Sequence, residues 1–260
     1  MAEDNIRLHK MVERSTDEVL FWRPTSPVFW NTEEHSHSKG QLLSLRSGLA
    51  ILETTAGVWM LLPGRCGWIP PGCRHSMRSC GRIDGWSIYL TALLCNSLST
   101  QPGILSLSSL LKEIVSRISE WKQDPPTPEF RHHLLTVLCD EIQNATQQPL
   151  HLPMPSDLRL RRFVEEMSKE PQKERTLDAW ARFTGMSKRS LLRTFQQETG
   201  MTIGQWRQHL RMLVALEKLS NGLSVTETCL AVGYNSVSAF IKTFKQIVGM
   251  TPHAYSRVQR

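Results

Sequence analysis

The sequence predicts an α+β chain of more than one domain: a β-rich N-terminal part, two amphipathic helices and an all-helical C-terminal part. Three observations predict this arrangement. Residues 20–90 hold short apolar runs separated by turn residues. Residues 104–145 carry apolar side chains at helical spacing. Residues 151–260 contain a repeated pattern and 17 Lys and Arg against 9 Asp and Glu, whereas residues 1–150 hold 14 against 15.

The composition of the 260 residues is that of a globular protein, with 40% hydrophobic and 21% charged residues, which excludes a disordered or fibrous chain. No apolar run approaches the roughly 18–20 residues that cross a bilayer, and the first thirty residues lack the pattern of a signal peptide. We therefore expect a cytoplasmic protein with no membrane partner. The six cysteines form no CxxC pair, which favours buried thiols over a zinc site or disulfide framework; a redox sensor built on Cys66, Cys73 and Cys80 is the alternative.

The β-rich part predicts a small barrel or a sandwich. Its strand-like runs are LLSLRSG, LAILETTAG, VWMLLPG, GWIPPG and GWSIYL. Thr55-Ala56-Gly57, Pro63-Gly64 and Pro71-Gly72 supply turns between them. Many short strands at nearly even spacing are typical of such folds.

Two amphipathic helices are expected over residues 104–121 and 129–145. They either cover an open side of the β domain or pair with a second copy of the chain. The proline-rich QQPLHLPMP at 147–155 reads as a linker. The predicted domains are accordingly a barrel at 1–103, a helical pair at 104–146, a linker at 147–156 and a basic domain at 157–260.

The basic domain contains one supersecondary unit used twice. Leu177, Ala181 and Gly185 match Val225, Cys229 and Gly233, each 48 residues later. After one inserted residue, the match continues at a separation of 49. The later pairs are Leu191 with Phe240, Phe195 with Phe244, and Gly200-Met201-Thr202 with Gly249-Met250-Thr251.

Each unit reads as a helix, a glycine turn and a second helix. Gly185 supplies the tight turn, Ser187 is a plausible N-cap, and Leu191 and Phe195 bury one face of the second helix. This is the helix-turn-helix, whose second helix enters the DNA major groove; the two motifs are expected at about 177–198 and 225–248. A helical repeat used only for packing would leave the basic excess unexplained.

Thr202 to Leu219 reads as one helix joining the two units. At about 1.5 Å per residue it spans about 27 Å. That length approaches the roughly 34 Å between successive major grooves on one face of B-DNA. One chain can thus place two helices in adjacent grooves of double-stranded promoter DNA.

Residues 157–257 resemble the DNA-binding domain of the AraC/XylS family of bacterial transcription regulators, including the closing sequence GMTPHAYSR at 249–257. The resemblance implies a non-enzymatic regulator that binds promoter DNA as an activator or a repressor. It also implies a homodimer, and contact with RNA polymerase if the protein is an activator.

Helical spacing from Leu191 and Phe195, together with the family pattern, assigns outward positions. We expect base contacts from the outward residues of both second helices, where Arg and Lys can bond guanine and Leu192 can contact only an apolar group. These residues are Arg189, Leu192, Arg193, Ser238 and Lys242. The neighbouring outward positions of the second motif are Val237 and Ile241. Contacts to the DNA backbone are expected from Ser187, Lys188, Asn235, Ser236 and Lys245.

The N-terminal part resembles cupin barrels. His35-Ser36-His37 stands upstream of Gly64-x5-Pro70-x-Gly72-x2-His75, and Gln41 takes the place of the usual Glu ligand, while Ser79 takes that of an Asn. The resemblance implies a cupin-like effector-binding barrel in which His35, His37, Gln41 and His75 bind a small molecule or a divalent metal. Five tryptophans are candidates to line its pocket or to fill its core: Trp22, Trp30, Trp59, Trp68 and Trp86.

The leading hypothesis is therefore a ligand-responsive transcription regulator. The alternative is a cupin-type metal-dependent enzyme that uses His35, His37 and His75 and carries a helical appendage. The missing Glu ligand and the duplicated basic motif favour the regulator.

Overall fold

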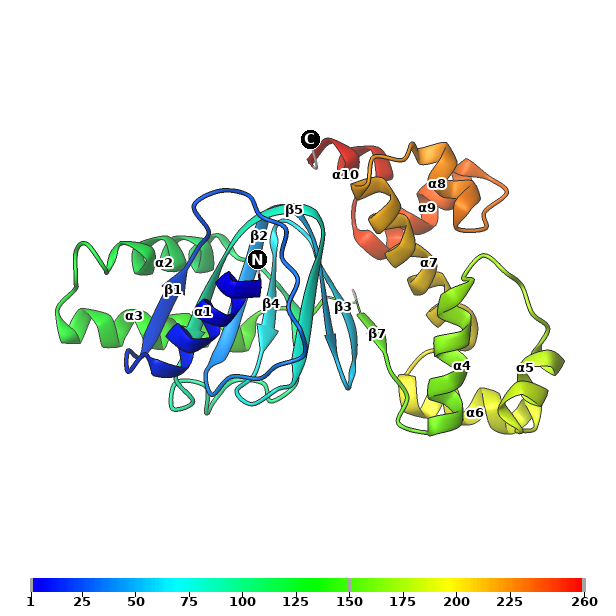
Figure 1. Ribbon diagram of the computed structural model, residues 1–260, viewed down its shortest axis with the longest axis horizontal. Helices are drawn as coiled ribbons and strands as arrows, with labels where there is room; N and C mark the ends of the chain where they lie inside the picture. Colours follow the sequence, from blue (N-terminus) through cyan, green and yellow to red (C-terminus); the bar gives the residue numbers. More distant parts are fainter. Residues whose placement is uncertain (1, 149–150, 259–260) are drawn as a thin grey trace. The chain divides into compact units, whose positions relative to one another are not determined.

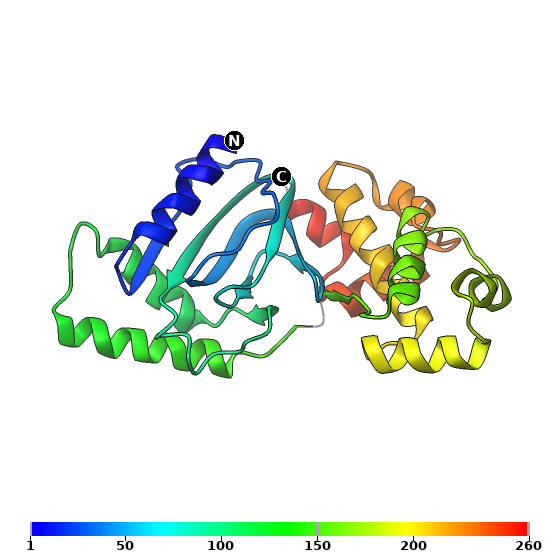
Figure 2. The same ribbon diagram turned by 60° about the horizontal axis from the view of Figure 1, so that its bottom comes forward.

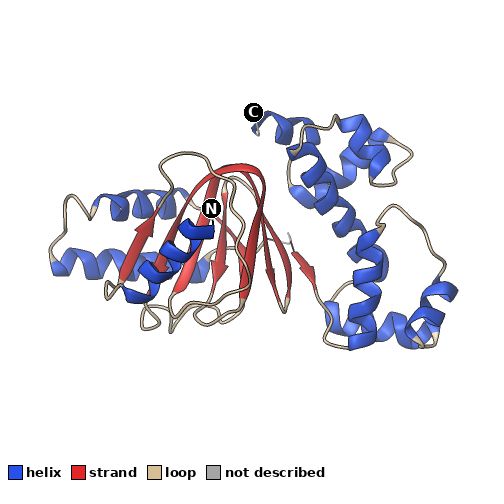
Figure 3. Cartoon of the chain, viewed as in Figure 1, coloured by secondary structure: helices blue, strands red, loops and turns tan. Residues whose placement is uncertain are grey.

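A computed structural model describes residues 2–148 and 151–258. The chain divides into two compact units: the first comprises residues 1–54 and 59–149, the second residues 55–58 and 150–260. Strands dominate the first unit and helices the second (Figure 3). The expected combination of an antiparallel β domain with a C-terminal helical domain is confirmed. Within the described residues, no helix has the length and hydropathy needed to span a membrane.

The first unit is built on a curved antiparallel sheet (Figure 1). Its strands run in the order β1-β5-β2-β3, and β4 pairs with both β2 and β6. Their bounds are β1 Val19–Trp22, β2 Gly40–Thr54, β3 Gly57–Leu61, β4 Arg65–Ile69, β5 His75–Leu90 and β6 Gly103–Ser106. The helices of this unit are α1 Ala2–Arg14, α2 Ser109–Glu120 and α3 Pro128–Asn144.

One pair of long strands replaces several of the short strands expected from the sequence. The runs LLSLRSG and LAILETTAG form the single strand β2, because Gly48 sits in a bulge instead of a turn. Gly48 has a φ of +92°, and a Cβ there would lie 2.6 Å from Ile83 Cγ2. The close approach of β5 therefore requires glycine at this position while pairing continues on both sides.

Alternating side chains of the sheet separate two packing faces, as strand geometry requires. Val19, Ile88 and Leu90 pack with α2 and α3, which bury apolar stripes that include Leu111 and Leu138. Tyr89, together with the partly buried Leu20 and Trp22, packs instead with Leu8 and Val12 of α1. The helical pair thus covers one face of the sheet, as one of the two sequence interpretations held, and Figure 2 shows α2 and α3 together along that side.

One expectation for the helices of this unit was wrong. The helix expected from residue 104 begins only at Ser109, where the Ser108 side chain accepts a hydrogen bond from Leu111 N. Ile104 lies instead in β6, opposite Gly67 of β4. The second expected helix, 129–145, is confirmed as α3 within one residue at each end. Helix α1 was not expected at all, because its sequence is mostly polar and charged.

In the described part of the chain, the second unit consists of seven helices that follow the short strand β7 (His151–Pro153). This strand lies inside the expected linker. The helices are α4 Leu158–Lys169, α5 Leu177–Thr184, α6 Lys188–Thr199, α7 Ile203–Ser220, α8 Val225–Ala231, α9 Val237–Val248 and α10 Pro252–Val258. The expected connecting helix is confirmed as α7. Its N-cap Thr202 forms a capping box with Gln205.

Candidate functional site

The first helix-turn-helix unit is α5, a turn at Gly185, and α6. Gly185 ends α5 in the left-handed region, with a φ of +64°, and the Ser187 side chain caps α6 by accepting a hydrogen bond from Ser190 N. Phe195 and Trp180 both pack on Phe163 of α4, with ring centroids 5.6 and 4.8 Å apart. Local capping and this aromatic cluster together fix the direction of α6.

The second unit repeats the design with α8, a turn at Gly233, and α9. Gly233 has a φ of +83°, and the Ser236 side chain caps α9 through Ala239 N. Phe240 and Phe244 are fully buried, and Phe244 packs on Tyr255 of α10. The two motifs expected from the repeat are therefore both present as helix-turn-helix structures.

The candidate base-contacting residues of α6 all reach solvent. Leu191 and Phe195 are buried, whereas Arg189, Leu192 and Arg193 are exposed. Leu192 is 45% exposed and presents an apolar side chain to solvent. This face offers two forked guanidinium groups, which can hydrogen-bond guanine edges, beside one apolar side chain, which can contact a thymine methyl group.

The corresponding face of α9 is less polar. Val237, Ser238 and Lys242 are exposed, and Ile241 is half-buried. Ser238 and Lys242 are the two hydrogen-bonding side chains among these four positions. The chemistry of α9 therefore allows fewer specific hydrogen bonds to base edges than that of α6.

The five candidate backbone-contacting residues are exposed, but three already have partners. The hydroxyls of Ser187 and Ser236 serve as helix caps, and Lys188 Nζ lies 2.6 Å from Asp178 Oδ1. Asn235 and Lys245 are exposed at the start and in the last turn of the α9 motif. The Ser236 hydroxyl, which caps its helix by accepting, can still donate its proton to a phosphate oxygen, whereas the Ser187 hydroxyl already donates to Ser190 Oγ at 2.9 Å.

The first unit contains a cavity of about 380 Å³. It is lined by α1, by the segment between β1 and β2, and by the long strands, and most of its lining is apolar. Trp22, Trp30 and Trp86 contribute to the wall, as one of the sequence interpretations held. Trp59 and Trp68 do not: their side chains are buried in the hydrophobic cores of the unit.

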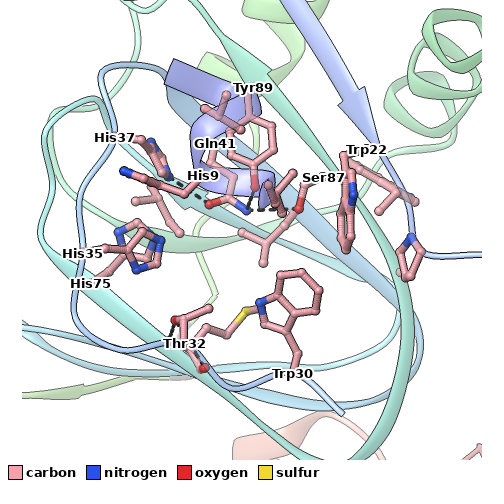
Figure 4. Close-up of a pocket in the computed structure, with 18 of the residues that line it drawn as sticks. His9, Trp22, Trp30, Thr32, His35, His37, Gln41, His75, Ser87 and Tyr89 are labelled. Atoms are coloured by element: carbon pink, nitrogen blue, oxygen red, sulfur yellow. Dashed lines mark hydrogen bonds between the residues drawn. The ribbon is translucent and has the colours of Figure 1, made fainter. Parts of the chain in front are cut away.

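Three histidines meet at one end of the cavity (Figure 4). The ring centroids of His35 and His75 are 4.3 Å apart, and those of His37 and His75 are 5.0 Å apart. One ring nitrogen of each lies within 4.8 Å of the others. His35 and His75 are also paired through their backbones, by hydrogen bonds of 2.8 and 2.9 Å. The structure thus brings together the three histidines that the sequence singled out.

Gln41 joins this cluster from β2. Its Oε1 lies 3.1 Å from His37 Nε2, and its Nε2 lies 3.0 Å from Ser87 Oγ and 3.1 Å from Tyr89 Oη. Ser79 lies away from the cluster and accepts a hydrogen bond from Trp30 N. The cluster is therefore built from neutral donors and acceptors, with no carboxylate among its three histidines and one amide.

Burial disfavours the charged forms of His37, His75 and Tyr89. It lowers the pKa of His37, and it lowers the pKa of His75 to about 3. Burial also raises the pKa of the Tyr89 hydroxyl. The inner end of the cavity accordingly offers imidazole, amide and hydroxyl groups to a bound molecule.

One lining residue that the sequence interpretation missed is His9 of α1. Its ring lies edge-on to that of His35, with centroids 5.7 Å apart. The spacing of Leu8 and Val12, both buried against Tyr89, was the available signal. It marks the inner face of a helix and so places His9 beside that face.

Comparisons with known proteins agree with this architecture. Residues 180–257 match the family model of a helix-turn-helix domain. Over 244 residues the chain is 33% identical to the HTH-type transcriptional regulator NimR of Escherichia coli (strain K12), a match that covers 94% of this chain and 85% of that protein. It is 24% identical over 259 residues to the HTH-type transcriptional activator RhaR of Pectobacterium atrosepticum, covering 91% and 82%.

Two solved structures are also similar. ToxT from Vibrio cholerae O395 matches with a TM-score of 0.41 and 12% identity, covering 93% of this chain and 97% of that one. The DNA-binding domain of AdpA, in complex with a target DNA, matches with a TM-score of 0.36 and 27% identity, covering 38% and 90%.

The two helix-turn-helix units and these relatives define a DNA-binding transcription regulator. The chain belongs to the AraC/XylS family of HTH-type transcriptional regulators, as the resemblance predicted. Its partner is double-stranded DNA. The comparisons give no support to the alternative of a cupin-type enzyme.

Proposed function

We propose that this regulator reads promoter DNA through the outward faces of α6 and α9, and that an effector bound in the cavity of the first unit changes this binding. The observation that carries the proposal is that α6 has one buried face and one exposed, basic face. Leu191 and Phe195 anchor one face without exposure, while Arg189 and Arg193 present guanidinium groups on the other. A bidentate Arg–guanine contact contributes about 1–3 kcal/mol of base discrimination.

In this assignment the two motifs contribute unequally to base recognition. Arg189, Leu192 and Arg193 supply most of the sequence discrimination, with smaller contributions from Ser238 and Lys242. Ser187, Lys188, Asn235, Ser236 and Lys245 bind phosphates and set the register on the duplex. Salt dependence of binding follows from these phosphate contacts, because each neutralised phosphate releases condensed counterions.

The experiment compares Arg193→Ala with a control of equal charge change, Arg162→Ala, an exposed arginine of α4. Affinity of the full chain is measured for its own promoter fragment and for a scrambled duplex, at several salt concentrations. Arg193→Ala should reduce the ratio of the two affinities about tenfold or more, whereas Arg162→Ala should leave it unchanged. Equal effects of the two variants, or binding of the parent chain that is insensitive to salt, would refute the assignment.

A cupin-like sensor role for the first unit is supported by the cavity of about 380 Å³ and by its polar end at His35, His37, Gln41 and His75. Effector control requires that the bound molecule favour one state of the protein over another. The test measures promoter affinity with and without candidate small molecules. Compounds that bind the cavity without changing promoter affinity would contradict this part.

We also propose a homodimer formed through α2 and α3. Leu110, Phe130 and Val137 are 51, 45 and 40% exposed on these two helices, outside their buried stripes. Sedimentation of the parent chain and of Phe130→Glu tests this, and the variant should be monomeric.

The protein would act on promoter DNA as an activator or a repressor, and it would work in the cytoplasm. RNA polymerase would be a further partner if it activates.

A further inference from the structure

We propose that His35, His37 and His75 bind one divalent transition metal ion through their Nε2 atoms, and that His9 of α1 is a further ligand that ties this helix to the metal. The proposal deepens the effector role above and rests on it only for the step from metal to promoter. Metal binding itself is testable without DNA.

The hydrogen bonds of the three rings orient their free nitrogens. Nδ1 of His35, His37 and His75 lies 2.9, 2.5 and 2.9 Å from the backbone oxygens of Glu33, Lys39 and Cys73. A carbonyl oxygen only accepts, so each Nδ1 carries the proton and each Nε2 presents a lone pair. This arrangement, in which the outer nitrogen donates to a carbonyl, is the one that orients metal-binding histidines in proteins.

The spacing of the rings fits one ion. Two imidazoles that bind the same metal at about 2.1 Å place their ring centroids roughly 4.5–5.3 Å apart. The observed distances are 4.3 Å for His35–His75, 5.0 Å for His37–His75 and 6.1 Å for His35–His37. Small rotations of the rings would bring the ligand nitrogens, now within 4.8 Å of one another, to the separation that a metal requires.

Gln41 supports the same conclusion. With its amide nitrogen donating to Ser87 and Tyr89, its Oε1 faces His37 Nε2 at 3.1 Å. Both of these atoms are then acceptors, and acceptors face each other favourably only across a proton or a cation. A set of neutral nitrogen donors with one amide oxygen suits Zn²⁺, Ni²⁺ or Cu²⁺ and disfavours Mg²⁺ and Ca²⁺.

His9 extends the cluster beyond the β-sheet. Its ring centroid lies 5.7 Å from that of His35, close to the separation expected for two ligands of one ion. Leu8 and Val12 hold α1 on Tyr89, and Glu13 Oε1 accepts a hydrogen bond from Ser38 N at 2.7 Å. Metal binding at His9 would therefore stabilise α1 over the cavity.

The test titrates the metal-free full chain with Zn²⁺, Ni²⁺ and, as a negative control, Mg²⁺, and it records the visible spectrum of a Co²⁺ complex. His132 and His133 lie side by side on α3 and could bind Ni²⁺ on the surface, so every measurement is repeated in a His132→Ala/His133→Ala background. We expect one Zn²⁺ or Ni²⁺ per chain, no Mg²⁺ binding, and a Co²⁺ spectrum characteristic of nitrogen ligands.

Substitutions distinguish the loss of a metal ligand from the loss of folding. His75→Ala and the half-buried His35→Gln should abolish binding, His9→Ala should weaken it about tenfold, and Gln41→Glu should strengthen it by adding an anionic ligand. Circular dichroism confirms that each variant folds. Binding that survives both His35→Gln and His75→Ala, or a chain with no affinity for any of the three transition metals, overturns the site.

Two further readouts distinguish the parts of the proposal. Metal should slow proteolysis within residues 2–14 of the parent chain but not of His9→Ala; equal protection of the two would overturn the role of His9. Promoter affinity is then measured with metal and with chelator. A change supports the metal as effector, whereas an unchanged affinity in a chain that binds metal overturns the effector role and leaves the metal site standing.

Discussion

Glu198 of α6 accepts two hydrogen bonds from Ser156, at 2.7 Å from its backbone N and 3.0 Å from its Oγ. The same oxygen accepts a third from the backbone N–H of Asp157, at 3.0 Å. The helix that carries Arg189 and Arg193 is therefore fastened at its far end to the start of α4. An anion is favourable at this place, because the N–H groups that precede a helix are otherwise unpaired.

Glu198→Ala should weaken this attachment by about 1 kcal/mol, a value reduced from that of a buried charged hydrogen bond because the site is partly exposed. Hydrogen exchange of the full chain, followed by mass spectrometry, should show faster exchange in peptides from α4 and α6. Glu198→Gln retains an oxygen acceptor and should show a smaller effect. Unchanged exchange in Glu198→Ala would contradict the prediction.

Thr228 should be a site of easy stabilisation. Its Oγ1 is buried and has no hydrogen-bond partner among the described residues, so Thr228→Val removes an unsatisfied polar atom at nearly constant shape. We expect a gain of about 1–2 kcal/mol, measured from urea unfolding of α8 and α9 in the full chain. Thr184→Val is the matched control, because Thr184 Oγ1 donates to Trp180 O at 3.0 Å and its loss should not stabilise. A destabilised Thr228→Val would refute the prediction.

The two turn glycines should differ in their tolerance of alanine. Both have positive φ values, +64° at Gly185 and +83° at Gly233, so each substitution costs about 1–2 kcal/mol in backbone strain. A Cβ at Gly185 meets open space, whereas one at Gly233 would lie 2.9 Å from Gln172 Cα. Gly233→Ala should therefore lower the thermal unfolding midpoint more than Gly185→Ala, and the reverse order would be inconsistent with this contact.

Asp157 makes stability depend on acid pH. Its hydrogen bond to Arg159 and its place at the N-terminus of α4 lower the pKa of the carboxyl to about 2. A lowered pKa in the folded state means that the contribution is fully present above the unfolded pKa of about 3.9 and is lost as the pH falls toward 2. It amounts to at most about 1 kcal/mol, because the pair is solvent-exposed.

The measurement compares thermal unfolding of the parent chain with that of Asp157→Asn between pH 7 and pH 2.5. Asn keeps a capping oxygen but not the charge. The parent should be more stable at neutral pH, and the difference should shrink toward the acid end, where part of it remains because the folded-state pKa is about 2. A difference that persists unchanged at pH 2.5 would show that charge is not its source.

The helical unit could be predicted closely because its signals are local. Gly185 and Gly233 mark positions that need positive φ, Ser187 and Ser236 cap the helices that follow, and Phe195 and Phe244 mark the buried faces. Each of these decisions involves residues within a few positions of one another. The outward-facing residues of α6 and α9 follow by subtraction.

The sheet unit could be predicted only in part because its structure depends on distant contacts. Gly48 is a bulge instead of a turn, since β5 supplies a partner strand some thirty residues away in the chain. Whether a tryptophan lines the cavity or fills the core depends on packing between distant segments: Trp22 and Trp30 line the cavity, whereas Trp68 is buried in the core with α2 and α3. The three histidines were found by their motif spacing, but His9 joins them only through the packing of α1.

The contact between Trp22 and Trp30, with ring centroids 4.8 Å apart in the cavity wall, has a practical consequence. Indole fluorescence responds to the polarity and quenching of its surroundings, so a molecule that binds in the cavity should change the emission of this tryptophan pair. Candidate inducers can be screened by emission alone, on unlabelled protein and before any operator has been mapped.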